Sequence, residues 1–272
     1  MTEFVERYSR FSEEKDSILC VGLDPALPRQ RSQNTIPKKY LEKKTDENEA
    51  RLEFCLDIID ETSDLCCAYK PNQQYIWGFT KKQHKTLATA IHDAHAISIL
   101  DYKLNDIGAT IESALFHTHD CGYDALTFNP LLGNLQTTVN TAHEYKPQIG
   151  IIVLTLTSNP EAIKYQVQAI IGGRFLYVAI AEDVKRYRAD GCVIGATGHI
   201  TATDIKTIRA RAGEDKLLLF PGIGAQKGDA EKVIQTAGKN ILINVGRAII
   251  YSENPTEKAK QYNKTFNNLR KA

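Results

Sequence analysis

Three charged residues lie close together in the segment 98–110, which reads S-I-L-D-Y-K-L-N-D-I-G-A-T. Asp101 and Lys103 are two positions apart, so on a β-strand their side chains would point to the same face. Asp106 follows just past the expected strand end, next to Gly108, where the chain can turn. Buried charges are costly unless they pair or take part in chemistry. The segment is therefore either a catalytic carboxylate–ammonium–carboxylate set or an ion pair on an exposed edge strand.

Two glycine-containing loops near the C-terminus have a composition that suits an anion. They read P-G-I-G-A-Q-K-G-D at 221–229 and N-V-G-R-A-I at 244–249. Glycine lets backbone N–H groups come close to an anion, and Arg247 could hold a phosphate through two parallel hydrogen bonds. One such loop would be a weak signal, but two of them, one with an arginine, favour a phosphate site.

The elements that must position these residues alternate between strand and helix along the chain. Apolar runs predict strands at 18–24, 66–70, 97–104, 125–129, 150–156, 192–196, 216–220 and 241–245. Amphipathic or capped segments predict helices at 47–65, 80–94, 110–120, 135–145, 175–189, 202–212, 229–237 and 256–269. Such alternation indicates a parallel sheet, and eight units in about 250 residues is the size of a TIM barrel.

We therefore expect one (β/α)8 TIM-barrel domain over residues 1–272, with a polar connection at about 26–46 and an insertion at about 159–174. A doubly wound open sheet is the alternative, but the first strand–helix turn, D-P-A-L-P, lacks the glycine-rich dinucleotide fingerprint. In a TIM barrel the active site lies at the carboxyl ends of the strands. The polar residues expected there are Asp24, Lys70, Asp101, Lys103, Asp106, Ser158, Gln226 and Arg247.

The composition argues against several classes of protein. The 34 Lys and Arg nearly cancel the 33 Asp and Glu, so we expect no nucleic-acid-binding surface spread over the chain. No apolar run approaches the roughly 20 residues of a membrane span, and the first residues lack the apolar stretch of a signal peptide. Six cysteines without C-x-x-C spacing indicate reduced thiols in a cytoplasmic protein. The histidines lack a third ligand at metal spacing.

Six motifs occur together over nearly the whole chain. They are D-x-K-x-x-D-I-G-x-T at 101–110, V-G-L-D-P at 21–25, Y-K-P-N at 69–72, T-S-N-P at 157–160, P-G-I-G-A-Q at 221–226 and V-G-R at 245–247. With these motifs the chain resembles the orotidine 5′-phosphate decarboxylases, and in particular their longer, bacterial-type branch. The resemblance implies decarboxylation of orotidine 5′-phosphate to UMP and CO2, the last step of de novo UMP biosynthesis, without a metal or cofactor.

The resemblance also implies a role for each matched catalytic residue. Lys103 would donate the proton to C6, Asp101 would lie beside the substrate carboxylate, and Lys70 would bridge the ribose and Asp101. Asp106 and Thr110 would reach into the neighbouring subunit's site, which makes the enzyme a homodimer with two shared sites.

Other matched residues would bind the substrate. Asp24 would hold a ribose hydroxyl, and Ser158 would contact the pyrimidine. The implied phosphate ligands are Gln226, Gly246 and Arg247. The insertion at about 159–174 would close over the phosphate as a lid.

Two rival interpretations use the same barrel. A sugar-phosphate decarboxylase or aldolase of this fold also carries an Asp-x-Lys-x-x-Asp set, but it needs Mg²⁺. A catalytically inactive barrel that binds phosphate would be a structural or regulatory protein. Outside the site, we expect Trp77 at the barrel mouth or a dimer seam. Tyr102 should face the helix layer, because it alternates with Asp101 and Lys103.

Overall fold

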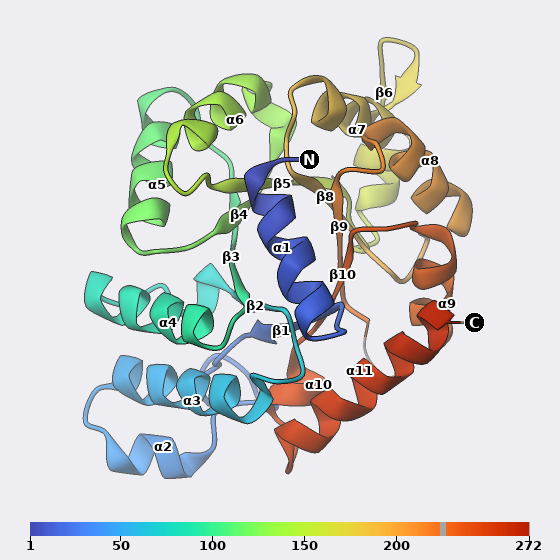
Figure 1. Cartoon of the computed structure of the whole chain (residues 1–272). Helices are drawn as coiled ribbons and strands as arrows, with labels where there is room; N and C mark the ends of the chain where they lie inside the picture. The colour runs from blue at the N-terminus through green and yellow to red at the C-terminus, as the bar shows by residue number, and fades with distance from the viewer. Residues whose placement is uncertain (224–226, 272) are drawn as a thin grey trace.

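Eight parallel strands close into a barrel surrounded by helices (Figure 1). The computed structural model describes residues 1–223 and 227–271. In order around the barrel, the strands are β1 (Leu19–Leu23), β10 (Ile241–Val245), β9 (Leu217–Pro221), β8 (Gly191–Ile194), β5 (Gly150–Leu156), β4 (Ala125–Phe128), β3 (Ile97–Leu104) and β2 (Ala68–Pro71). Pairing of Leu19 with Ile243 joins β1 to β10 and closes the ring. This closure confirms the predicted TIM barrel and excludes the open sheet.

Helices that follow the strands pack on the outside of the barrel. They are α3 (Glu47–Thr62), α4 (Lys81–Asp93), α5 (Ala109–Asp120), α6 (Leu135–Glu144), α7 (Leu176–Arg186), α8 (Ala202–Ala212), α9 (Lys227–Thr236) and α11 (Pro255–Lys271). Thr80 caps α4 as predicted: its hydroxyl accepts the Gln83 N–H, and the Gln83 side chain accepts the Thr80 N–H. Within residues 1–223 and 227–271, no helix is long and apolar enough to cross a membrane.

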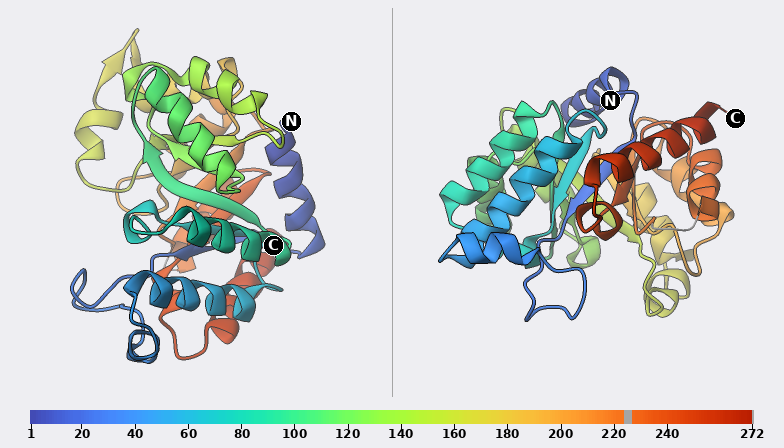
Figure 2. Two further views of the ribbon diagram at one scale, coloured as in Figure 1. Left: turned by 90° about the vertical axis from the view of Figure 1, so that its left-hand side faces the viewer. Right: turned by 90° about the horizontal axis from the view of Figure 1, so that it is seen from below.

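Several short elements were not predicted from the sequence. They are α1 (Glu3–Glu14), α2 (Lys38–Lys43), α10 (Arg247–Ile250), the 3-10 turns η1 (Gln73–Tyr75) and η2 (Pro130–Leu132), and the hairpin of β6 (Ile170–Ile171) and β7 (Arg174–Phe175). The expected insertion also holds a π-helical turn, η3 (Ile163–Val167). Figure 2 shows α1 at one end of the barrel and, at the other end, both the 26–46 connection and the hairpin. The two insertions are therefore on the side where the strands end.

Side chains along β3 alternate between two apolar layers. Ile97 and Ile99 point into the barrel and belong to one buried cluster with Phe4 of α1. Leu100 belongs to the second cluster, between strands and helices, and Tyr102 packs against that cluster, half-buried. The prediction that Tyr102 faces the helix layer is confirmed.

Helix α1 closes the amino-terminal end of the barrel. Phe4, Val5 and Tyr8 are buried there, and the Tyr8 hydroxyl donates a hydrogen bond to the Ile241 carbonyl. Gly150 makes room for this contact, because a Cβ at that position would lie 2.5 Å from a Phe4 ring carbon. The missing side chain at 150 thus lets an aromatic ring fill the barrel floor.

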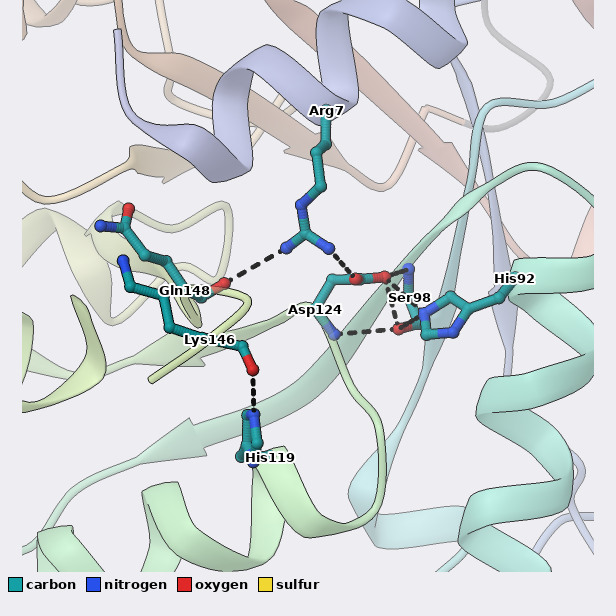
Figure 3. A network of polar contacts seen from close by, with 7 residues as sticks. All are labelled: Arg7, His92, Ser98, His119, Asp124, Lys146 and Gln148. Atoms are coloured by element: carbon teal, nitrogen blue, oxygen red, sulfur yellow. Dashed lines mark hydrogen bonds and ion pairs between the residues drawn. The ribbon is translucent and has the colours of Figure 1, made fainter. Parts of the chain in front are cut away.

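A buried aspartate ties α1 to the strands at this end (Figure 3). Asp124 precedes β4, and its Oδ1 accepts a hydrogen bond from Arg7 of α1 at 2.7 Å. Its Oδ2 accepts from the backbone N–H of Ser98 at 2.8 Å and pairs with His92 Nε2 at 2.9 Å. One carboxylate therefore connects α1, α4, β3 and β4.

A similar arrangement recurs two strands further around the barrel. Asp190 precedes β8, and its Oδ2 accepts from the Ile151 N–H at 2.7 Å and pairs with His143 Nε2 at 3.0 Å. Its Oδ1 accepts from the Thr2 hydroxyl, next to the start of α1. Two aspartate–histidine pairs therefore hold α1, one through Thr2 just before the helix and one through Arg7 in its second turn.

The Asp124–His92 pair should make stability depend on pH. Its hydrogen bond raises the pKa of His92 despite burial, which tends to lower it. A raised folded-state pKa stabilises the fold below the ordinary histidine pKa of about 6.5, and this contribution is lost as the pH rises through the folded-state pKa. We expect His92→Gln to reduce the free energy of unfolding more at about pH 5.5 than at about pH 8.5.

Urea unfolding at both pH values measures this difference, which should stay below about 1 kcal/mol because His92 is half-exposed. His119→Gln is the control, since the His119 ring bonds the Lys146 carbonyl instead of a carboxylate. An equal loss at the two pH values in H92Q would contradict the account.

Candidate active site

Three of the predicted catalytic side chains meet at the carboxyl end of the barrel, opposite α1. Lys70 lies near the end of β2, and Asp101 and Lys103 lie on the neighbouring strand β3. Asp101 continues the inward-facing series of Ile97 and Ile99. The alternation that fills the barrel with isoleucine therefore also turns this carboxylate toward its open end.

The Asp101 carboxylate is held between two ammonium groups. Lys70 Nζ donates to Asp101 Oδ2, and Lys103 Nζ donates to Asp101 Oδ1 at 2.6 Å. The side chains of Lys70 and Asp101 are 6% and 11% exposed, whereas that of Lys103 is 54% exposed. Lys70 is thus a buried partner of the carboxylate, and Lys103 is the ammonium that a ligand can reach.

The pair of Asp101 and Lys70 is charged at neutral pH. Burial raises the pKa of Asp101, but Lys70 and Lys103 outweigh burial and hold this pKa well below its usual range. Burial alone would lower the pKa of Lys70. The negative charges of Asp101 and Asp24 outweigh burial, so the pKa of Lys70 lies above its ordinary value. The surface ion pair considered for this segment is therefore not what the chain forms.

Asp24, expected to bind a ribose hydroxyl, lies just past the end of β1 and contacts the long polar connection. Arg31 Nη2 is 3.5 Å from Asp24 Oδ2, and the guanidinium lies over the Tyr75 ring, 4.3 Å from its centroid. The Tyr251 hydroxyl donates to the Asp24 carbonyl at 2.6 Å and accepts from the Ala26 N–H at 2.9 Å. The connection thus returns to the site and adds a third cation, Arg31, to Lys70 and Lys103.

Ser158, the expected pyrimidine contact, follows β5. The end of β8 passes close to it, because a Cβ on Gly195 would lie 2.7 Å from the Ser158 nitrogen. The insertion that comes next forms η3 and the β6–β7 hairpin. Its Gln166 accepts a hydrogen bond from the Thr157 N–H at 2.7 Å, so the insertion is tied to the strand end beside Ser158.

The expected phosphate residues are described in part. Gly246 and Arg247 follow β10, and the Gly246 backbone packs against Gly22 of β1. Arg247 is exposed at the first position of α10. Gln226 lies outside the described residues. Two of the three predicted phosphate ligands are therefore placed at the carboxyl end of the barrel.

Asp106 and Thr110 follow β3 and have contacts outside the lysine–aspartate group. Asp106 Oδ1 accepts from the Ile107 N–H at 2.8 Å, and its carbonyl accepts from Asn134 Nδ2 at 2.8 Å. Thr110 is exposed in the first turn of α5. Throughout the part of the chain that the structure describes, no hydrogen bond or ion pair joins either residue to Lys70, Asp101 or Lys103.

Comparison with known proteins identifies the family of this chain. Residues 17–262 match the model of the orotidine 5′-phosphate decarboxylase / HUMPS family. The chain belongs to this family. The orotidine 5′-phosphate decarboxylase of Cupriavidus metallidurans is 36% identical over 261 residues, covering 92% of this chain and 89% of the relative. That of a Roseiflexus species is 34% identical over 281 residues, covering 99% and 96%.

Solved structures of the decarboxylase family have the same fold. The Leishmania donovani OMP decarboxylase has a TM-score of 0.79 at 25% identity and covers all of both chains. An orotidine-monophosphate decarboxylase assigned in Toxoplasma gondii has a TM-score of 0.82 at 27% identity, covering 98% of this chain and 95% of that one. The family predicted from the motifs is confirmed.

Two residues of the site were missed by the sequence analysis. Arg31 belongs to a polar segment without periodicity, so nothing in the sequence connects it to Asp24. Thr127 of β4 donates to Asp101 Oδ1 at 3.1 Å. A signal for Thr127 did exist, because it is a polar residue near the end of an apolar strand whose neighbour in the barrel carries Asp101.

Proposed function

We propose that this site decarboxylates orotidine 5′-phosphate to UMP and CO2 in the cytoplasm, with Lys103 as the proton donor. The family to which the chain belongs, and the relatives it resembles over most of its length, support decarboxylation as the activity. The observation that carries the residue assignment is the buried Asp101 carboxylate held between Lys70 and the half-exposed Lys103. This group offers a fixed positive charge at the open end of the barrel.

The chemistry explains why such a group is needed. When the bond from C6 to the carboxylate breaks, CO2 leaves and the electron pair stays on C6, where no conventional electron sink exists. A preorganised ammonium stabilises the negative charge as it forms and then supplies the proton. Lys103 would transfer a proton from Nζ to C6 and regain one from solvent. Asp101 fixes the ammonium at 2.6 Å and would lie beside the reacting carboxylate.

Binding energy from the rest of the substrate can serve this step. Asp24 would hold the ribose, Ser158 would contact the pyrimidine, and Gly246 and Arg247 would bind the phosphate together with Gln226. The 159–174 insertion, tied at Thr157, would close over the phosphate. Contacts with the non-reacting parts of a substrate raise the rate when they are completed only in the closed complex.

We further propose that the enzyme is a homodimer in which Asp106 and Thr110 complete the partner's site. Large apolar side chains are exposed in the segments that follow the neighbouring strands β2, β3 and β4. They are Trp77 at 72%, Ile107 at 60%, Phe116 at 53%, Leu131 at 57% and Leu132 at 50% exposure. Such side chains mark an interaction surface. A second copy is the fitting partner, because Asp106 and Thr110 flank the exposed Ile107 in the same segment.

Turnover after chelation separates this proposal from its rivals. In the proposed chemistry the positive charge comes from the Lys103 ammonium, which Asp101 holds in place together with Lys70. The reaction therefore does not require a metal ion. The fall in ultraviolet absorbance as orotidine 5′-phosphate becomes UMP should be as fast after exhaustive treatment with EDTA as before. Loss of the rate that Mg²⁺ restores would favour the metal-dependent sugar-phosphate enzyme. A wild-type protein without any turnover would be the inactive phosphate-binding barrel.

Mixed dimers test the shared site. Homodimers of Lys103→Ala and of Asp106→Ala should each be nearly inactive. In a mixed dimer, one site has both substitutions, and the other combines an intact Lys103 with the partner subunit's Asp106. We expect each mixed dimer to recover about half of the wild-type rate, because a two-fold axis makes two equivalent sites.

The mixed dimers can be purified with a different affinity tag on each subunit. If Asp106 served its own subunit's site, both sites would carry one defect. Mixed dimers as inactive as the two parents would therefore contradict the shared site.

A further inference from the structure

We propose that Thr127 is a positioning residue, whose hydroxyl holds Lys103 and Asp101 in the arrangement that delivers the proton. This inference rests on the proposed function of Lys103.

Strand β3 bulges beside β4 at the catalytic residues. Ile99 and Leu100 pair with Ala125 and Leu126, and the next pair is Leu104 with Phe128. Residues 101–103 therefore lie opposite the single residue 127. Bulges of this kind re-aim side chains and leave backbone groups without their usual strand partners.

Lys103 has an unusual backbone conformation in this bulge. Its φ angle is 52°, in the left-handed region that residues with a side chain rarely adopt. Such conformations cluster at functional sites and persist only where surrounding contacts fix them. The conformation of Lys103 therefore needs a specific support.

Thr127 supplies that support from β4. Its side chain is buried, and its Oγ1 accepts the backbone N–H of Lys103 at 2.9 Å. The same hydroxyl donates its proton to Asp101 Oδ1 at 3.1 Å. Asp101 Oδ1 in turn accepts from Lys103 Nζ at 2.6 Å. One hydroxyl thus holds both the main chain of Lys103 and the carboxylate that orients its ammonium.

Removing the hydroxyl would leave the N–H of Lys103 without its partner inside the bulge. The backbone could then leave the left-handed region, and the ammonium would move away from C6. Small errors in the position of a reacting group are costly, because the rate depends on the geometry of attack. Substrate affinity should change little, because the ribose and phosphate groups are bound by other residues.

Thr127→Val and Thr127→Ser separate this role from packing. T127V keeps the side-chain shape and loses the hydroxyl, whereas T127S keeps the hydroxyl and loses the methyl group. We expect kcat of T127V to fall about tenfold to hundredfold, with KM changed by less than about threefold. T127S should retain kcat within about threefold of the wild type.

Thr118→Val is the matched control. Thr118 is also buried, but its hydroxyl donates to the Ala114 carbonyl within α5, so kcat should not change. A T127V enzyme with the wild-type kcat would overturn the inference. Equal losses in T127V and T127S would overturn it as well, since the methyl group and not the hydroxyl would then matter.

A crystal structure of T127V decides the inference without any turnover. Lys103 outside the left-handed region, with its Nζ displaced from Asp101, supports the positioning role. An unchanged β3 bulge overturns it. A wild-type enzyme that fails to decarboxylate orotidine 5′-phosphate would instead refute the proposed function, and the T127V structure would still test the role of Thr127.

Discussion

A carboxylate buried between two ammonium groups is the constraint on which the site depends. Asp101 could not stay ionised at this depth without cations on both sides, and the two lysines hold its pKa low enough to keep the charge. Lys70, Asp101 and Lys103 together carry one net positive charge. The fold therefore has to bring the ends of β2 and β3 together accurately, because a displacement would leave a buried charge without its partner.

The two ends of the barrel have different tasks. At the amino-terminal end, Asp124 and Asp190 tie α1 across the floor, where Phe4 fills the space that Gly150 leaves. At the carboxyl end, the polar connection and the β6–β7 insertion surround the lysine–aspartate group. This division, with stability at one end and chemistry at the other, is the general organisation of TIM barrels. It allows the loops to carry exposed apolar residues, and the end of β3 to carry a lysine with a left-handed backbone, without weakening the core.

Much of this could be predicted from the sequence, and the exceptions have physical reasons. Apolar runs predicted the strands, and alternation along β3 predicted the outward direction of Tyr102. Helix α1 was missed although its buried residues Phe4, Val5 and Tyr8 recur at helical spacing, because it precedes the first strand and stands outside the strand–helix alternation. The left-handed conformation of Lys103 and the contact of Arg31 with Asp24 were missed because both result from tertiary packing. The family motifs implied roles for the matched residues. They did not predict the bulge in β3 that Thr127 supports, because the bulge depends on the pairing of β3 with β4.

The central claim is that Lys103 stabilises the carbanion at C6 and protonates it. Its most direct test is the rate of orotidine 5′-phosphate decarboxylation by Lys103→Ala, beside Lys264→Ala, an exposed lysine of α11. With circular dichroism showing both variants folded, we predict that K103A loses a factor of about 10⁴ or more and that K264A keeps the wild-type rate. A K103A enzyme within about tenfold of the wild type would contradict the account.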